Sequence, residues 1–316
     1  MQHVLEKLAA TNPASEIWWD SSPLIYGKWA DGVLKSAPED KRDLWSEQLS
    51  RLLDPATVAS SGEMGFRGVT TNPPLSLQAI KGDPDRWVSR IRALCNEEPS
   101  ATVEEVYWKI YLEVVRDGAA MIRSVWDASN GLYGFVSGQV DPRCVTDYDA
   151  MLEQALSIAA QGPNIMVKAP GSMQGYQIIE EMTARGISTN NTTSFSMPQY
   201  VACMDAVSRG LERAKANNVD LSRWRSVITH MSARLTGLGD MLDQAALRGI
   251  EISPDEAQLA ELAVMKRAYR HIRDTGHPSK MLMCSMRVNN DDGQGGARSL
   301  HICLLYTSDA ADDDRG

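Results

Sequence analysis

The sequence contains no long run of apolar residues. No stretch approaches the roughly 18 residues that a transmembrane helix requires, so we expect no membrane partner. The segment Met1–Lys7 also lacks the basic and then apolar order of a secretory signal peptide. Together these absences predict a cytoplasmic protein.

Cysteine is scarce, and basic residues are outnumbered by acidic ones. The five cysteines form no CxxC pair, and none lies at zinc-ligand spacing from a histidine, so we expect reduced thiols and no bound metal. Lys and Arg total 32 against 41 Asp and Glu, which gives a formal net charge of −9. Because nucleic acids bind to clustered basic surface, this charge argues against a nucleic-acid partner.

The rest of the composition is that of a folded globular protein. The chain has 316 residues, 43% hydrophobic and 23% charged, which is enough for one large domain or two of ordinary size. Short apolar runs of strand length alternate with amphipathic helical stretches. The expected strands are 17–20, 68–72, 135–140, 165–168, 187–192, 227–231 and 281–285, and the clearest helices are 148–161, 176–184, 198–216 and 254–273.

This alternation predicts parallel strands joined by helices, either as a doubly wound sheet or as a closed eight-stranded barrel. A dinucleotide-binding sheet has a glycine-rich turn after its first strand, whereas the turn here reads Asp20-Ser21-Ser22-Pro23, and no GxxxxGK[ST] loop is present. Nearly every expected strand ends on a polar residue, as in a TIM barrel, where the strand ends form the active site. We therefore predict an α/β TIM barrel, truncated before its eighth strand because only seven strands are counted.

The C-terminal residues differ in composition from the rest of the chain. From Asn289 the chain becomes rich in Asn, Asp and Gly, and the stretch Leu304–Asp312 resembles translated sequencing-adapter sequence. We therefore predict one barrel domain over residues 1–300 and a non-native tail over residues 301–316. A barrel that has lost one strand exposes two edges, so we expect this chain to aggregate.

Lys168 is the strongest single candidate for chemistry. It follows the apolar run Ile165–Val167 at the end of an expected strand. A water-poor barrel penalises the charged ammonium, and the neutral amine is the form that attacks a carbonyl carbon to give a Schiff base. The alternative is a structural lysine whose amine reaches out into water.

Polar residues at other strand ends are further candidates, each with a structural alternative. Asp20 follows Trp18-Trp19 and can transfer protons at the edge of an apolar surface, or it can cap a turn. Side chains that can position a hydroxyl or a water, or simply bond to loops, are Asn72, Gln139 and Thr192. Two further pairs combine a hydroxyl with an arginine, namely Thr229 with Arg234 and Ser285 with Arg287. Such a pair can bind a phosphate group, or its arginine can form an ion pair at the surface.

Several segments resemble the transaldolase family, and they follow in the same order along the chain from about residue 16 to residue 288. The segment RGVTTNP (67–73) resembles the second strand of that family, and NIMVKAP (164–170) resembles its active-site lysine strand. Further similar segments are VDPR (140–143) after the third strand, residues 186–196 at the fifth, and Ser-Met-Arg (285–287) at the seventh.

The resemblance implies an enzyme of the pentose phosphate pathway that needs no metal or organic cofactor and moves a dihydroxyacetone unit between sugar phosphates through a lysine Schiff base. It implies that Lys168 is the nucleophile and Asp20 the general acid/base. It also implies that Asn72 holds a hydroxyl of the bound unit and that Thr192 orients the catalytic water. The residues that it implies for binding the sugar phosphate are Thr229, Arg234, Ser285 and Arg287.

Two positions depart from the family pattern. The third-strand glutamate of the family is Gln139 here, and a carboxamide cannot accept the proton that a carboxylate accepts, which weakens relay through Thr192. Fructose-6-phosphate aldolase relatives carry glutamine there, but they are shorter and have a tyrosine near the position of Met231. His230 is unusual at its position as well. It is either a satisfied histidine, whose ring nitrogens form hydrogen bonds within the protein, or a contact for phosphate or for an unusual acceptor.

Three functions stay open. The first is a transaldolase, the second is an aldolase or a transaldolase specialised for an unusual sugar, and the third is a barrel with a binding role and little turnover. The presence of Lys168, Asp20 and Asn72 argues against the third. A homodimer is compatible with each of them, and the insertion at residues 31–64 has no predicted role.

Overall fold

The computed structural model describes residues 7–8, 15–58, 65–238, 240–289, 297–299 and 302–306. Eight strands hydrogen-bond in the closed order β1-β10-β7-β6-β5-β4-β3-β2, so the chain forms the predicted α/β barrel. The barrel strands are β1 (Glu16–Asp20), β2 (Gly68–Thr70), β3 (Phe135–Gln139), β4 (Ile165–Pro170), β5 (Thr189–Thr192), β6 (Ser226–Met231), β7 (Lys280–Cys284) and β10 (Ile302–Tyr306). The first seven lie where the apolar runs predicted them.

The strands between β2 and β7 show why those runs are apolar without alternation. β2 pairs parallel with β3, β3 with β4, β5 with β6, and β6 with β7. Every residue of β4 and β6 except the last is buried. Strands of a parallel sheet are covered on both faces, which favours continuous hydrophobic sequence over a period of two.

The eighth strand comes from the segment that we predicted to lie outside the fold. β10 pairs antiparallel with β7, with Leu305 opposite Leu282, and both Cys303 and Leu305 are fully buried. The apolar run Ile302–Tyr306 satisfies the open edge of β7, which is otherwise a row of unpaired backbone groups. This finding corrects the expected count of seven strands and makes the barrel mixed instead of all-parallel. That residues 301–316 are non-native stays a prediction.

The chain divides into two compact units. Unit 1 (Met1–Thr11 and Trp19–Lys168) contains β2, β3 and most of β4. Its helices are α2 (Tyr26–Ser36), α3 (Arg42–Arg51), α4 (Pro73–Gly82), α5 (Pro84–Glu97), α6 (Val103–Met121), α7 (Arg123–Ala128) and α8 (Tyr148–Ala159), with 3-10 helices η1 (Pro23–Ile25), η2 (Glu39–Lys41), η3 (Pro55–Val58) and η4 (Pro142–Cys144). The predicted helix 148–161 is confirmed in α8.

Aromatic packing holds the N-terminal helices of unit 1 to its strands. Trp19 stacks on Phe66 with ring centroids 5.8 Å apart and meets the edge of Tyr26 at 5.4 Å. The insertion at residues 31–64 supplies the rest of α2, then η2, α3 and η3. The carbonyl oxygen of Thr57 in this insertion accepts a hydrogen bond of 2.8 Å from Arg67, the residue before β2. The insertion therefore contributes to holding the start of β2.

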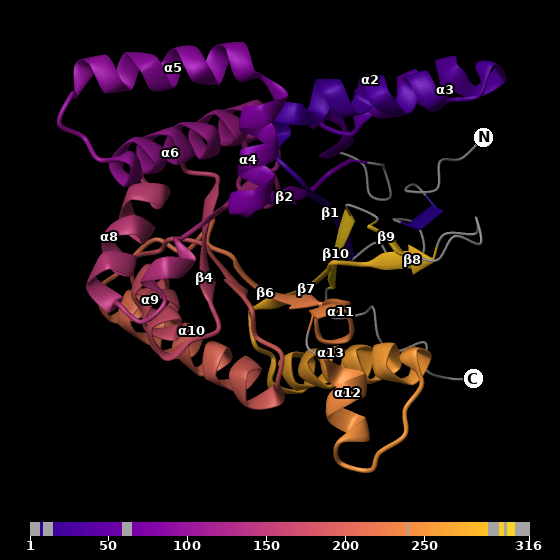
Figure 1. The fold of residues 1–316 in the computed structure, drawn as a ribbon. Coiled ribbons are helices and arrows are strands. Elements are labelled where there is room, and N and C mark those ends of the chain that lie inside the picture. The colour runs from indigo at the N-terminus through magenta and orange to yellow at the C-terminus, as the bar shows by residue number, and fades with distance from the viewer. Residues whose placement is uncertain are drawn as a thin grey trace. The chain divides into compact units, whose positions relative to one another are not determined.

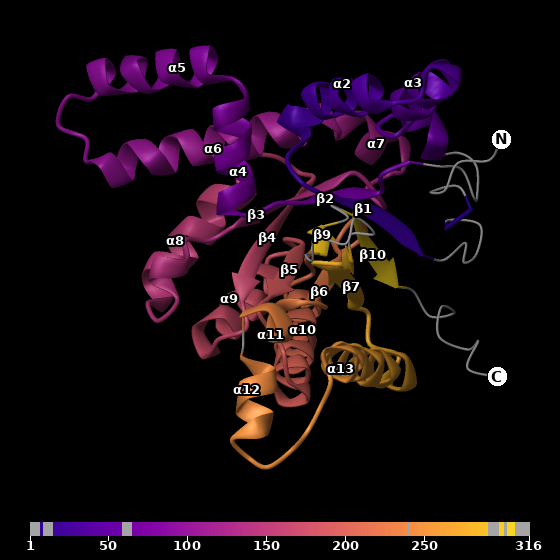
Figure 2. The same cartoon turned by 45° about the vertical axis from the view of Figure 1, so that its right-hand side comes forward.

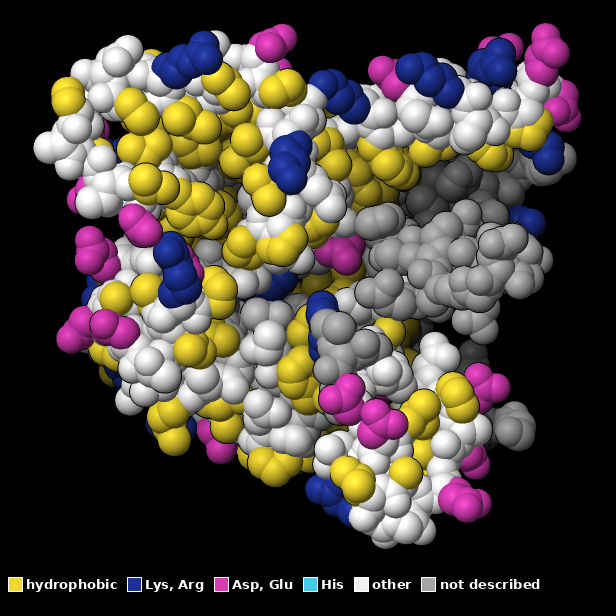
Figure 3. Space-filling model, viewed as in Figure 1, with side chains coloured by type: hydrophobic (Ala, Val, Ile, Leu, Met, Phe, Trp, Pro, Cys, Tyr) yellow, Lys and Arg dark blue, Asp and Glu magenta, His cyan; other side chains and the backbone are white. Residues whose placement is uncertain are grey.

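Helices α5 and α6 run antiparallel to each other within unit 1 (Figure 1). They bury Trp87 and Leu94 of α5 against Ile110 and Val114 of α6. Figure 3 shows apolar side chains gathered along this helix pair. Burial of these large side chains is the main term that holds the pair together.

Unit 2 (Asn12–Trp18 and Ala169–Gly316) contains β5, β6, β7 and β10. Its other elements are α9 (Met173–Ala184), α10 (Met197–Ala216), α11 (Arg234–Leu238), α12 (Met241–Ala246), α13 (Pro254–Thr275) and the antiparallel pair β8 (Arg287–Asn289) and β9 (Ala297–Ser299). Figure 2 shows α10 and α13 beside strands β5 to β7. Pro198 and Pro254 lie in the first turns of α10 and α13, and Gly186 takes a φ of +74° after α9, as the sequence predicts.

A buried ion cluster lies at the N-terminal ends of β1, β6 and β7 in unit 2. The Glu16 carboxylate contacts Arg225 at 2.5 Å and Lys280 at 3.2 Å, and it also accepts from the Trp18 indole at 3.0 Å. Burial alone would raise the pKa of Glu16, but Arg225 and Lys280 lower it below its ordinary value.

Among the described helices, none combines the length and apolarity needed to cross a membrane.

Candidate active site

Lys168 is buried in unit 1, as the catalytic interpretation requires. Its side chain lies on β4 and the residue is only 6% exposed. The amine donates to the carbonyl oxygen of Thr71 at 3.0 Å and to the hydroxyl of Thr70 at 3.3 Å. Both oxygens are neutral, and in the described part of the chain no carboxylate pairs with this amine. The structure therefore excludes the alternative of a lysine that reaches into water.

Gln139 is the strand neighbour of Lys168. The two residues are partners in the parallel pairing of β3 with β4, and paired residues of adjacent strands project to the same face of a sheet. The Gln139 backbone N–H donates to the hydroxyl of Tyr111 on α6 at 2.7 Å, and this hydrogen bond holds the end of β3 to that helix. The carboxamide of Gln139 is thus placed on the same face as the amine.

The other predicted site residues of unit 1 are Asp20, which ends β1, and Asn72, which lies two residues after β2. The Asn72 side-chain oxygen caps α4 by accepting from the Leu75 N–H at 3.0 Å. With its oxygen so engaged, the side chain can offer its NH2 group to a hydroxyl. Asp20 is half-buried at the end of β1, and the cap residue of the following 3-10 helix is Ser22 and not Asp20.

In unit 2, Thr229 and Thr192 lie on neighbouring parallel strands. The Thr229 hydroxyl donates to the Asn190 side-chain oxygen at 2.7 Å, and all three residues are buried. The β5–β6 register pairs Asn191 with Ile228, so one further step brings Thr192 level with Thr229. Asn190 was not among the predicted site residues. Its position two residues before Thr192, on the same face of β5, is the sequence signal that identifies it.

The other predicted phosphate-binding residues follow β6 and β7. Arg234 is the first residue of α11, and its guanidinium contacts the Met231 sulfur at 3.6 Å. Ser285 follows β7 with a φ of +57°, a left-handed conformation that is uncommon for serine and typical of functional turns. Arg287 begins β8 opposite Ser299, and its side chain lies outside what the structure describes.

His230 does not share the face of Thr229. Its ring is buried, and its Nδ1 lies 2.6 Å from the hydroxyl of Tyr200 on α10. Adjacent side chains of a strand point to opposite faces, so His230 points to the helix layer while Thr229 points to Asn190. Burial lowers the pKa of His230 to about 4, which keeps the ring neutral near pH 7. Its Nε2 is buried as well and has no hydrogen-bond partner among the described residues, so the histidine is only half satisfied. Its place toward the helix layer nevertheless argues against a phosphate contact.

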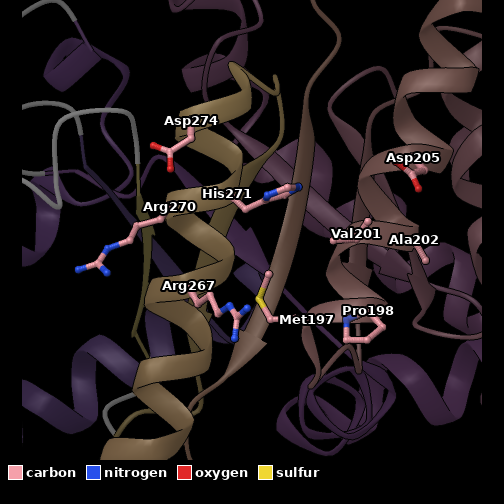
Figure 4. A pocket seen from close by; sticks show the side chains of 9 residues that line it. All are labelled: Met197, Pro198, Val201, Ala202, Asp205, Arg267, Arg270, His271 and Asp274. Carbon is pink, nitrogen blue, oxygen red and sulfur yellow. The ribbon is translucent and has the colours of Figure 1, made fainter.

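A hollow of about 700 Å³ lies in the helix layer of unit 2. Met197, Pro198 and Val201 of α10 line one side, and Arg267 and His271 of α13 line the other (Figure 4). None of the predicted site residues whose side chains the structure describes lines this hollow. Among the described residues, no group of three acidic, histidine or cysteine side chains is arranged to hold a metal ion.

Comparisons with known proteins agree with the segments noted in the sequence. A family model described as transaldolase/fructose-6-phosphate aldolase matches residues 53–291. The chain is 33% identical over 250 residues to Transaldolase 2 of Streptomyces avermitilis, a match that covers 77% of this chain and 66% of that protein. It is 30% identical over 285 residues to the transaldolase of Thiobacillus denitrificans, covering 82% and 76% respectively. Transaldolase 1 of Streptomyces avermitilis is 33% identical over 208 residues, which are 65% of this chain and 54% of that protein.

Proposed function

The chain belongs to the transaldolase/fructose-6-phosphate aldolase family, and on this basis we propose that it is a transaldolase. It moves a dihydroxyacetone unit from a ketose phosphate to an aldose phosphate, in the pentose phosphate pathway. The match spans 54% to 76% of the length of the relatives named above, so the activity is proposed from the site residues as well as from the family. The observation that carries the proposal is the buried amine of Lys168, which bonds to neutral oxygens.

Lys168 and Asp20 carry the covalent steps. The Lys168 amine attacks the ketose carbonyl carbon, and loss of water gives an iminium. The Asp20 carboxylate takes the proton of the substrate hydroxyl as the adjacent carbon–carbon bond breaks, and the electron pair of that bond moves into the iminium to give an enamine. The first aldose leaves at this stage.

The second half of the reaction reverses these steps on a new aldehyde. The enamine carbon attacks the carbonyl carbon of the acceptor aldose, and Asp20 returns the proton to the new alkoxide. Water oriented by Thr192 then adds to the iminium and releases the ketose product and the free Lys168 amine. The iminium itself accepts the electron pair, so no metal or organic cofactor is needed for this chemistry.

The remaining residues bind and orient the substrate. Asn72 holds a hydroxyl of the three-carbon unit through its NH2 group, since its oxygen caps α4. Gln139 holds the water that Thr192 orients, in place of the glutamate of the transaldolase pattern. The residues assigned to the sugar phosphate are Thr229, Arg234, Ser285 and Arg287. We further propose a cytoplasmic location and a homodimer, the latter to be measured by light scattering.

Reductive trapping tests the proposal directly. The full chain is incubated with fructose 6-phosphate and sodium borohydride, digested, and mapped by mass spectrometry. We expect a reduced three-carbon adduct on the peptide that contains Lys168, and no adduct in Lys168→Met. Absence of the adduct in the wild-type chain, with a known transaldolase trapped in parallel, would overturn the proposal and favour a binding role.

Gln139 favours a second candidate function, an aldolase that cleaves fructose 6-phosphate without transfer. A neutral carboxamide beside Lys168 is a weaker proton relay than a carboxylate. Adding erythrose 4-phosphate separates the two functions. A transaldolase forms sedoheptulose 7-phosphate, whereas an aldolase releases free dihydroxyacetone and glyceraldehyde 3-phosphate whether or not the acceptor is present. A transaldolase specialised for an unusual sugar gives the Lys168 adduct but prefers another acceptor aldose.

A further inference from the structure

A carboxylate lies on the buried face of helix α13. Glu261 is 1% exposed, and its neighbours on that face, Ala257, Met265 and Ala268, are apolar. A buried carboxylate is costly unless it is hydrogen-bonded, because it loses its water. Burial raises the pKa of Glu261, and hydrogen bonds from the backbone of Leu235 and Thr236 oppose that shift. Glu261 therefore accepts hydrogen bonds from a defined set of donors, which lie at residues 235 and 236.

Those partners belong to the turn that begins with Arg234. One carboxylate oxygen of Glu261 accepts from the Thr236 N–H at 2.9 Å, and the other is 3.3 Å from the Thr236 hydroxyl. Arg234 begins α11, so the amides of the following two residues are among the helix N–H groups that have no partner within the helix. Glu261 supplies the acceptors that these groups lack, from a helix about 25 positions further along the chain.

Among the residues that the structure describes, no acidic side chain contacts the guanidinium of Arg234. In the part of the chain that the structure describes, the contact found for it is the Met231 sulfur at 3.6 Å, which is a weak acceptor. Its position thus depends on the backbone of residues 234–236. A guanidinium without a carboxylate partner can bind an anion without first breaking an ion pair.

We propose that Glu261 is a positioning residue for sugar-phosphate binding: it fixes the 234–236 turn so that Arg234 is presented to the phosphate group of the substrate. The inference rests on the proposed phosphate-binding role of Arg234. Glu261 itself touches no substrate. It acts through the Thr236 N–H and hydroxyl, and its effect is confined to recognition of the phosphate.

The test compares a phosphorylated with an unphosphorylated donor in the full chain. For Glu261→Gln, one carboxylate oxygen becomes an NH2 group that cannot accept from the turn. We expect kcat/KM for fructose 6-phosphate to fall about tenfold more than kcat/KM for fructose, mainly through KM, and the inhibition constant of inorganic phosphate to rise by a similar factor. Glu251→Gln removes the same charge from an exposed site just before α13 and should leave the ratio of the two donors at the wild-type value.

A double-variant cycle separates positioning of Arg234 from a general structural effect. Arg234→Ala should produce the same selective loss, and adding Glu261→Gln to it should change the donor ratio no further, because both act on one interaction. If Glu261→Gln lowers both donors equally, or keeps its selective effect in the Arg234→Ala background, the inference is overturned. If Arg234→Ala itself leaves the donor ratio unchanged, the phosphate role of Arg234 is overturned together with this inference, while the Lys168 adduct still reports on the transaldolase proposal.

A second variant covers the case in which Glu261→Gln does not fold. Thr236→Val removes the hydroxyl that bonds to Glu261 and keeps the shape of the side chain and the backbone N–H. We expect the same selective change in the donor ratio, of about twofold to threefold. An unchanged donor ratio and an unchanged phosphate inhibition constant in a folded Thr236→Val chain would contradict the proposal.

Discussion

The amine of Lys168 lies 3.0 Å from the carbonyl oxygen of Thr71, the residue that precedes Asn72. Asn72 in turn caps α4 with its side-chain oxygen. One short segment after β2 therefore holds the proposed nucleophile through its backbone and carries the amide proposed to bind the substrate. A shift of this segment would move both groups together, so their relative position is set by local geometry.

Replacing Lys168 by methionine should separate activity from stability. Lys168→Met should abolish turnover, by a factor on the order of 10⁴ or more, because the nucleophile is lost. The free energy of unfolding should stay the same or rise by about 1–2 kcal/mol, since a buried amine is replaced by an apolar side chain of similar volume. Urea unfolding and a coupled transfer assay measure the two quantities. A large loss of stability would show that Lys168 is a structural residue; Lys215→Met, at an exposed site on α10, is the control.

Restoring a carboxylate at position 139 should favour transfer. We expect Gln139→Glu to raise the rate of transfer to erythrose 4-phosphate about tenfold or more, since general acid–base groups contribute at least that much. The backbone bond from residue 139 to the Tyr111 hydroxyl does not depend on the side chain, so the strand end should be unchanged. Gln258→Glu adds the same charge at an exposed site on α13 as a control. An unchanged transfer rate would show that the carboxamide does not limit the reaction.

The fold could be predicted from sequence wherever local chemistry decides it. Continuous apolar runs located seven strands, and Gly186 and Pro254 located the end of one helix and the start of another. β10 was not predicted, because its composition and setting suggested foreign sequence, whereas its place in the barrel depends on the open edge of β7, about 20 residues earlier in the chain. The apolar run Ile302–Tyr306 was a local signal for a strand, but its antiparallel pairing is a property of the assembled sheet and could not be read from it.

The candidate site was predictable in part for the same reason. Lys168 could be found because a charged residue interrupts an apolar strand. Asn190 was not predicted, although its place two residues before Thr192 on the same face of β5 was a signal in the sequence. Glu261 could not be predicted, since it is recognised only by its partner Thr236. The orientation of His230 was available from the period of two along β6, once Thr229 is assigned to the opposite face.

Glu16 should stabilise the barrel in a pH-dependent way. The pKa of its carboxyl is lowered, so its stabilisation is complete above the ordinary value of 4.5 and is lost as the pH falls through the lower value of the folded chain. Glu16→Gln leaves Arg225 and Lys280 without a counter-charge and should cost about 3–5 kcal/mol at pH 7. Urea unfolding from pH 7 to pH 3 tests both statements. Glu98→Gln, which breaks an exposed pair with Lys109, should cost less than about 1 kcal/mol.

His230 should add a second pH dependence in a different range. Burial lowers its pKa from 6.5 to about 4, so the unfolded chain binds a proton there more readily than the folded chain does. Stability should therefore be complete above pH 6.5 and fall between pH 6.5 and 4, by an amount on the order of 3 kcal/mol. His230→Asn should lower stability at pH 7, because the contact with the Tyr200 hydroxyl is altered, and should remove much of the slope in this range. His271→Asn, at an exposed site on α13, should keep the slope. Equal slopes in the wild-type and His230→Asn chains would mean that His230 takes up its proton in the folded state as easily as in the unfolded one.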